Sequence, residues 1–164
     1  MNDQNSFGAM LAIISAVRDA RTRPPVVATV ETTDSGGRRS VAKAHMNFND
    51  RIWSLTDENG ASEFHPESGW TISGESVPRE RDDWIPPGMR LFFPLSLPIW
   101  GGQMDNWRVT DAEVSGEDVH LSFQHKDDAA LFGQATIDLQ WGIATEFRVP
   151  WERMTLQDVK SSWE

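Results

Sequence analysis

The sequence predicts an α+β fold in which one N-terminal helix precedes about eight to ten mostly antiparallel strands, with an apolar insertion covering their inner face. Three observations predict it. Apolar residues recur at helical spacing near the N-terminus. They alternate with polar residues along much of the remaining chain. Between two such alternating regions lies the most apolar stretch, which four prolines prevent from forming one helix or a central strand.

The chain has the length of a single domain, and no change of composition marks a boundary within its 164 residues. We therefore expect one domain over residues 1–164. It would consist of an N-terminal helix over residues 6–23, a first strand set over residues 26–73, the apolar insertion over residues 74–106 and a second strand set over residues 107–160.

The predicted helix begins at Ser6, a residue type that favours the N-cap, and ends before Pro24-Pro25. Arg18 and Arg21 near its end complement the helix dipole. Its apolar residues form one stripe: Phe7, Met10, Leu11, Ile14 and Val17. We expect this stripe to pack against the protein core rather than on a membrane, because the polar face lacks a lysine-rich character.

Both strand sets are predicted from alternation with period two. In the first set the residues expected to face inward are Val26, Ala28, Val30, Ala42, Ala44, Met46 and Phe48. Turns rich in Gly, Asp and Asn then join three further strands up to Ser73. In the second set alternation resumes at Trp107 and continues to Leu156, which predicts a further run of antiparallel strands.

The insertion contains the candidate ligand-binding residues. Together they would form an exposed apolar patch larger than soluble monomers usually carry, so we expect them to fill the core, line a ligand cavity or dock onto a partner. These residues are Trp84, Leu91, Phe92, Phe93, Leu95, Leu97, Ile99 and Trp100.

Composition excludes several classes of function. The net charge of -10 repels phosphate backbones, so we expect no nucleic-acid partner. Cysteine is absent, which removes disulfides, thiolate metal sites and a cysteine nucleophile. No stretch has the length of a membrane span, and the N-terminal Asn2-Asp3-Gln4-Asn5 does not resemble a secretory signal. We therefore expect a cytoplasmic protein.

No catalytic signature is found: there is no nucleophile elbow, phosphate-binding glycine loop or dinucleotide fingerprint. Glu63, His65 and Glu67 could together ligate a metal. Such triplets arise often in an acidic chain, so we interpret them as an exposed strand end. The sequence thus predicts a binding protein with no metal, no cofactor and no catalytic residue.

Four places in the sequence form a recognisable pattern: the helix leading into residues 26–32, the pattern Asn49-Asp50-Arg51-Ile52-Trp53 followed by Gly69-Trp70-Thr71-Ile72, the apolar residues 91–100, and the closing residues 154–159. In these places and in the order of its elements, the chain resembles the outer-membrane-lipoprotein carrier superfamily, the LolA-like half-barrels. The resemblance implies an incomplete antiparallel barrel that encloses an apolar cavity. Family members that carry lipoproteins or glycolipids are exported, whereas this chain shows neither an export signal nor a cysteine to lipidate.

Two functions remain open at the level of sequence. The first is a non-catalytic binding protein that encloses a lipid or other apolar small molecule in a half-barrel cavity. The alternative is an acidic interaction module, such as an inhibitor, adaptor or immunity-type protein, that binds a basic protein and has no small-molecule ligand.

Overall fold

The structure, a computed structural model, describes residues 3–77 and 85–162, with side chains from Ser6 onward. The chain begins with helix α1 (Asp3–Ala20). The first strands are β1 (Val26–Asp34), β2 (Arg39–Asn47), β3 (Ile52–Asp57), β4 (Gly60–His65), β5 (Gly69–Ile72) and β6 (Glu75–Ser76). Two short 3-10 helices, η2 (Pro87–Phe92) and η3 (Pro94–Ser96), precede β7 (Trp107–Ser115), β8 (Asp118–His125), β9 (Phe132–Asp138), β10 (Ile143–Val149) and β11 (Glu152–Ser161).

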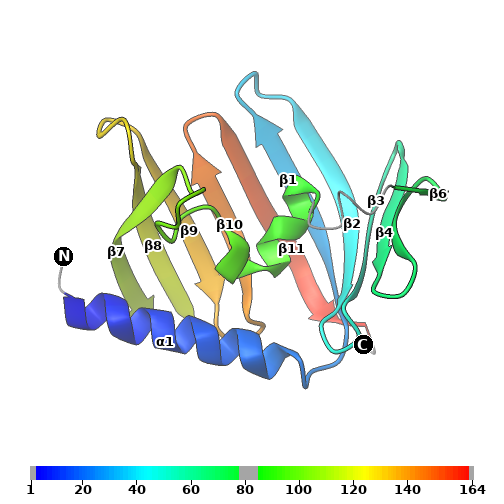
Figure 1. The fold of residues 1–164 in the computed structure, drawn as a ribbon, viewed down its shortest axis with the longest axis horizontal. Helices are drawn as coiled ribbons and strands as arrows, with labels where there is room; N and C mark the ends of the chain where they lie inside the picture. The colour runs from blue at the N-terminus through cyan, green and yellow to red at the C-terminus, as the bar shows by residue number, and fades with distance from the viewer. Residues whose placement is uncertain (1–2, 78–84, 163–164) are drawn as a thin grey trace.

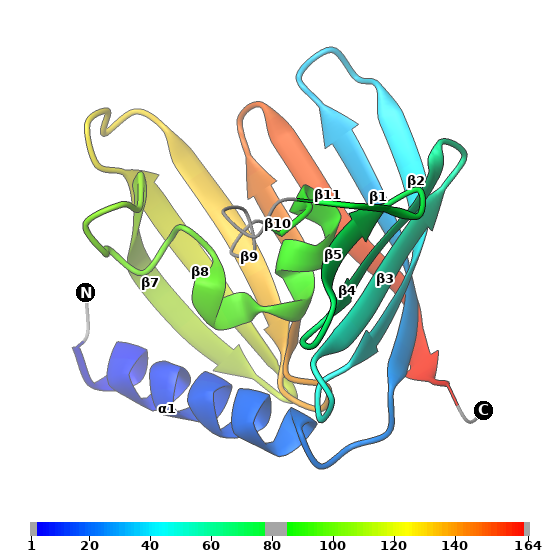
Figure 2. The same cartoon turned by 45° about the vertical axis from the view of Figure 1, so that its right-hand side comes forward.

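All eleven of these strands form one antiparallel sheet in the order β6-β5-β4-β3-β2-β1-β11-β10-β9-β8-β7. Strands β1 to β6 form one meander and β7 to β11 another, and the two are joined where β1 pairs with β11. The sheet curls around its inner side without closing (Figure 2). The predicted α+β half-barrel is confirmed. The strand beyond the predicted eight to ten is the two-residue β6, which lies within the segment predicted as insertion.

Alternation decides which side of the sheet is buried. In β1, Val26, Ala28 and Val30 are buried, while the residues between them are partly exposed. Met46 and Ala44 of β2 lie opposite Val26 and Ala28 and are also buried. These side chains make the concave face apolar, as the sequence predicted. A concave apolar face of this kind needs a cover.

The cover is a segment that we call the plug, residues 85–100, which includes η2 and η3 and lies on the concave side of the sheet (Figure 1). Strands β6 and β7 occupy opposite edges of the sheet, so the chain between them has to pass from one edge to the other. Prolines start both 3-10 helices, where their missing N–H group is not needed. Helix η2 contacts β1, β10 and β11 at the centre of the sheet. The prediction that the insertion covers the concave face is therefore confirmed.

Helix α1 differs from its predicted range of residues 6–23, because it begins at Asp3 and ends at Ala20. Beyond Ala20 the chain forms a turn in which the Thr22 hydroxyl donates to the Asp19 carbonyl at 2.8 Å. The physical reason is that a proline disfavours the helical conformation of the residue before it, so Pro24 ends the helix early. None of the described helices has the length and apolar character that a membrane crossing requires.

The face of α1 that packs on the sheet is also not the predicted one. Phe7, Leu11 and Ile14 are 67%, 51% and 45% exposed. The buried face consists instead of Ala9, Ile13, Ala16 and Ala20, and the helix contacts β7 at the edge of the sheet. Small side chains let the helix axis lie close to the strands. The expectation of one packed stripe is wrong for these three residues, whereas Val17 of the same stripe is half-buried and packs against the core.

Candidate functional site

A cavity of about 390 Å³ lies on the concave side of the half-barrel, between the plug, strands β2 to β4 and the end of α1. This volume is within the range of small-molecule sites in proteins. Its lining is Val17, Arg21, Met46, Phe48, Arg51, Trp53, Phe64, Ile85, Phe92, Phe93, Leu95 and Ser96. Nine of these twelve residues are apolar, so the cavity suits a ligand with a large apolar part.

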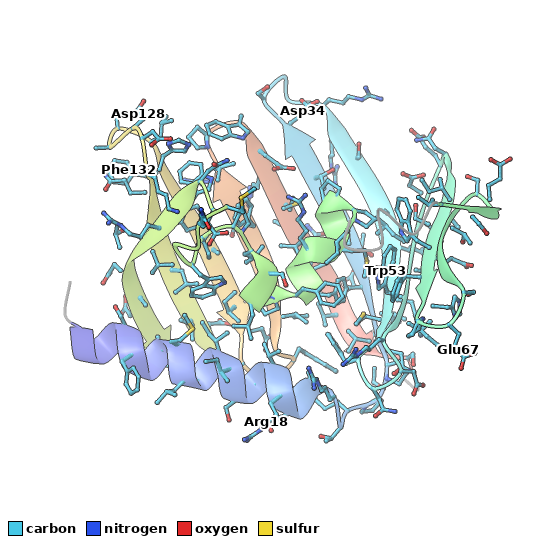
Figure 3. The ribbon with its side chains drawn as sticks, in the orientation of Figure 1. Arg18, Asp34, Trp53, Glu67, Asp128 and Phe132 are labelled. Carbon is cyan, nitrogen blue, oxygen red and sulfur yellow. The ribbon has the colours of Figure 1, made fainter. Side chains whose placement is uncertain are left out.

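The sheet side of the cavity is a row of large side chains from three neighbouring strands. Met46 of β2 lies opposite Trp53 of β3, and Trp53 lies opposite Phe64 of β4. The Trp53 and Phe64 rings are stacked with centroids 6.1 Å apart. Trp53 lies on β3 beside the plug (Figure 3). Cross-strand pairing fixes these side chains, so this wall is preformed.

The opposite side of the cavity comes from the plug. Phe92 ends η2, and its ring lies 6.5 Å from that of Phe48, which belongs to the loop after β2. Leu95 and Ser96 of η3 complete this wall. The Trp100 indole N–H donates to the Pro94 carbonyl at 2.9 Å and so ties the end of the plug to η3. The plug therefore forms this wall of the cavity and is stabilised by a hydrogen bond within the plug itself.

The mouth of the cavity carries positive charge. Arg21, directly after α1, and Arg51, in the loop between β2 and β3, are both exposed and both line the cavity. Val17, one turn of helix before Arg21, also lines it. Helix α1 thus contributes to the cavity with the residues next to its C-terminus, and the larger part of its length lies elsewhere.

Three of the sequence-predicted site residues, Phe92, Phe93 and Leu95, line the cavity. Trp84, predicted with them, lies outside the described residues. The part these side chains play in ligand binding stays a prediction.

The other predicted residues occupy different places. Leu91, Leu97 and Ile99 are fully buried in the hydrophobic core. Trp100 is half-buried and lines a separate cavity of about 140 Å³ that also involves Met10 of α1. The insertion is thus divided between residues that fill the core and residues that form the cavity wall.

Sequence reasoning missed the sheet side of the cavity and both arginines. Alternation placed Met46 and Phe48 on the inner face, which was the available signal for two of the wall residues. Trp53 and Phe64 meet through the register of three strands, and register cannot be deduced from one strand alone. Nothing in the local sequence around Arg21 or Arg51 indicates that they share a cavity.

A larger depression, of about 670 Å³, lies on the outer face of the sheet over β1, β2, β3 and β11. Its polar lining includes Lys43, His45, Asp158 and Lys160. It is formed by one face of the sheet, so it encloses nothing, in contrast to the cavity under the plug. Among residues 3–77 and 85–162 no group of three or more His, Asp or Glu side chains could hold a metal, and Glu63 and His65 belong to none.

Comparison with known proteins finds no matching protein-family profile and no matching curated protein. Solved structures are similar at low sequence identity. A chain of the Pseudomonas aeruginosa MucA/MucB complex has 14% identity and a TM-score of 0.49, and the match covers 90% of this chain and 55% of that one. This chain therefore spans about half the length of the MucB chains that it resembles.

Two further structures match along most of both chains. An uncharacterized conserved protein from Thermus thermophilus has 11% identity and a TM-score of 0.47, with 93% of this chain and 87% of that chain covered. A LolA superfamily protein from Nitrosomonas europaea has 11% identity and a TM-score of 0.32, with 91% and 93% covered. A LolA superfamily protein is thus among the solved structures that this chain resembles, as the sequence predicted.

Proposed function

We propose that this protein binds a lipid or similar apolar small molecule in the cavity beneath the plug. The observation that carries the proposal is the cavity itself: about 390 Å³ of space, walled by aromatic and aliphatic side chains from the sheet and from the plug. Burial of apolar ligand surface there contributes about 25 cal/mol per Å² to binding.

The size of the cavity limits the size of the ligand. A heavy atom in a condensed phase takes up roughly 30 Å³, the share of a water molecule in the liquid, so the cavity of about 390 Å³ holds roughly a dozen heavy atoms. This corresponds to one acyl chain of medium length. A lipid with several long chains would leave most of its apolar surface outside.

The first experiment is native mass spectrometry of the purified protein, followed by extraction and identification of any molecule released. A stoichiometric lipid or other apolar molecule supports the proposal. An apo mass that stays unchanged after incubation with single-chain lipids of eight to sixteen carbons contradicts it, since roughly a dozen heavy atoms should fit.

A variant at the cavity wall tests the site. Leu95 is suited to this because it is 41% exposed, so a carboxylate there does not enter the core, whereas a carboxylate at the buried Phe92 position would be strongly destabilising. We expect Leu95→Asp to weaken binding of an acyl chain by about tenfold or more, because the chain would have to desolvate the new carboxylate. Ile72→Asp is the matched control, since Ile72 is 45% exposed on β5 and lies outside the cavity. Equal binding by both variants would show that the ligand lies elsewhere.

The alternative function, an interaction module for a basic protein, has one structural observation in its favour. Phe7, Leu11 and Ile14 form an exposed apolar stripe on α1, and the acidic net charge would attract a basic partner. If no acyl chain binds, and a basic protein forms a complex of defined stoichiometry that Leu11→Ser disrupts, this function replaces the first.

A further inference from the structure

The charged side chains that line the cavity are all of one sign in the part of the chain that the structure describes. Arg21 and Arg51 line it, and no carboxylate does so among the residues that the structure describes. The remaining polar side chain of the lining is the hydroxyl of Ser96. In a chain with 25 acidic and 15 basic residues, acidic neighbours would be the expected surroundings of an arginine. Among the described residues, a ligand that enters this cavity therefore meets two positive charges and no carboxylate.

Neither guanidinium is committed to a partner within the described part of the protein. The ion pairs found there join Arg18 to Asp19, Arg39 to Glu31 and Arg153 to Glu146. Arg21 and Arg51 take part in none of them, and no side-chain hydrogen bond involves either residue in the same ranges. As far as residues 3–77 and 85–162 are concerned, both are thus available to an external anion.

The loop that carries Arg51 is held by its own polar side chains. The Asn47 amide donates to the Asp50 carboxylate at 2.8 Å, and the Asp50 backbone N–H donates to the Asn47 side-chain oxygen at 3.1 Å. Arg51 follows with φ of 57°, in the left-handed region that glycine and asparagine adopt more readily. The turn itself therefore does not favour arginine at this position, and the cavity beside it supplies a reason for the charge.

We propose that the ligand is a single-chain amphiphile with an anionic head group, whose head lies between Arg21 and Arg51 while its tail fills the apolar cavity. The proposal rests on the function proposed above. A guanidinium offers paired N–H donors that match the oxygens of a carboxylate or a phosphate. Both arginines are exposed, so the head group keeps part of its hydration and the desolvation that opposes buried ion pairs is avoided.

The negative charge of the whole protein does not prevent this. Charges farther away than the screening length, about 8 Å at physiological ionic strength, act weakly through solvent. The field at the cavity mouth is then set by nearby charges: Arg21 and Arg51 line the cavity, while the neighbouring Asp50 carboxylate accepts hydrogen bonds from Asn47 and Asn49. Binding of an anion should accordingly weaken as salt is added, because the local attraction is screened in the same way.

The test compares head groups on one tail. Dodecanoate, dodecyl phosphate, dodecan-1-ol and dodecyltrimethylammonium are titrated by calorimetry, the ionic compounds below the concentration at which they form micelles and the alcohol below its solubility limit. We expect the two anions to bind about tenfold more tightly than the alcohol, and the cation to bind more weakly than the alcohol. The ratio of the affinities for dodecanoate and dodecyl phosphate shows whether the site prefers a carboxylate or a phosphate head group.

Variants assign the preference to the two residues. Arg21→Gln and Arg51→Gln should each reduce the ratio of dodecanoate to dodecan-1-ol affinity about threefold, and the double variant should abolish it. Arg18→Gln is the control, because Arg18 is paired with Asp19, points away from the sheet (Figure 3) and lies outside the cavity lining. Thermal unfolding of each variant verifies that the fold is retained.

The outcomes separate this inference from the proposed function. If wild-type protein binds dodecanoate and dodecan-1-ol equally, the cavity binds acyl chains but the arginines do not select the head group, and the inference is wrong. If Arg18→Gln reduces the preference as much as Arg51→Gln, the effect belongs to net charge and the inference is again wrong. If none of the four compounds binds, the proposed function itself fails.

Discussion

At the scale of single residues, the contact between the plug and the sheet depends on a position without a side chain. Gly88 of η2 lies over β1, where a Cβ atom would come within 2.8 Å of the Val30 Cγ1 and 3.8 Å of the Leu55 Cδ2. Val30 is buried at the centre of the sheet, so it has little freedom to move away. The absence of a side chain at Gly88 therefore sets how close the plug lies to the sheet.

We predict that Gly88→Ala lowers the free energy of unfolding by about 1–3 kcal/mol, because the added methyl group overpacks the contact with Val30. Chemical denaturation measures this. Gly8→Ala in α1 is the control: a Cβ there meets nothing within 4 Å, and alanine should raise helix stability by up to about 1 kcal/mol. Unchanged stability of Gly88→Ala would mean that the plug can move away from β1 without loss.

At the scale of elements, α1 is attached through small residues and leaves its larger ones in solvent. Ile13 is fully buried, whereas its neighbour Ile14 is exposed. The two residues have the same side chain and adjacent positions in one helix, so they differ in burial and in little else. They therefore allow a direct measurement of how strongly α1 is held to the sheet.

We predict that Ile13→Ala lowers the free energy of unfolding by about 2–5 kcal/mol, since it removes a buried side chain and leaves a cavity. Ile14→Ala should change it by about 0.5 kcal/mol or less, because the side chain is exposed and alanine favours the helix. Urea denaturation of both variants measures the difference. Equal losses would show that Ile14 is covered in solution, for example by a second molecule.

The same helix shows why sequence predicted the elements better than their contacts. Periodicity is a local property, so helix, strands and the interrupted insertion could be predicted from it. Which face of α1 is buried depends on how near the helix comes to β7, and the packing of Ala9, Ala16 and Ala20 decided this against the larger Phe7 and Leu11. The spacing of these small residues was the signal that could have indicated the correct face.

The cavity, too, could be predicted where it depends on local sequence and not where it depends on contacts between distant segments. Phe92, Phe93 and Leu95 could be selected as candidates because they cluster in one apolar segment. The sheet wall requires Trp53 and Phe64 to be brought opposite each other, and the mouth requires Arg21, directly after α1, to come near a distant loop. These arrangements are non-local, and one sequence contains no measure of them.

At the scale of the whole molecule, the half-barrel is a preformed container whose capacity is set by a fixed wall and a covering segment. The sheet wall is held by strand pairing, and the plug is seated on β1, β10 and β11. The space between them therefore has a defined limit. A ligand that exceeds this limit must leave part of its chain in water or displace the plug.

We predict that affinity for straight-chain carboxylates rises with chain length up to about twelve carbons and then stops rising. Each methylene that enters the cavity contributes about 0.8 kcal/mol, and the cavity of about 390 Å³ is filled by roughly a dozen heavy atoms. Calorimetric titration with chains of six to sixteen carbons measures the slope and the plateau. An increase that continues to sixteen carbons would show that the plug moves to admit longer chains.

The pairing of β1 with β11 at the centre of the sheet has a consequence for how the protein is made. Residues 26–34 find their partner in residues 152–161, so the two meanders can join only after residues 152–161 have been synthesised. Until then β1 has one unpaired edge, and the plug lacks its contacts with β10 and β11. A contact between such distant parts of the chain slows folding and leaves the partly synthesised protein open to aggregation. Strand β11 thus completes the half-barrel, because β1, β10 and the plug all depend on contacts with it.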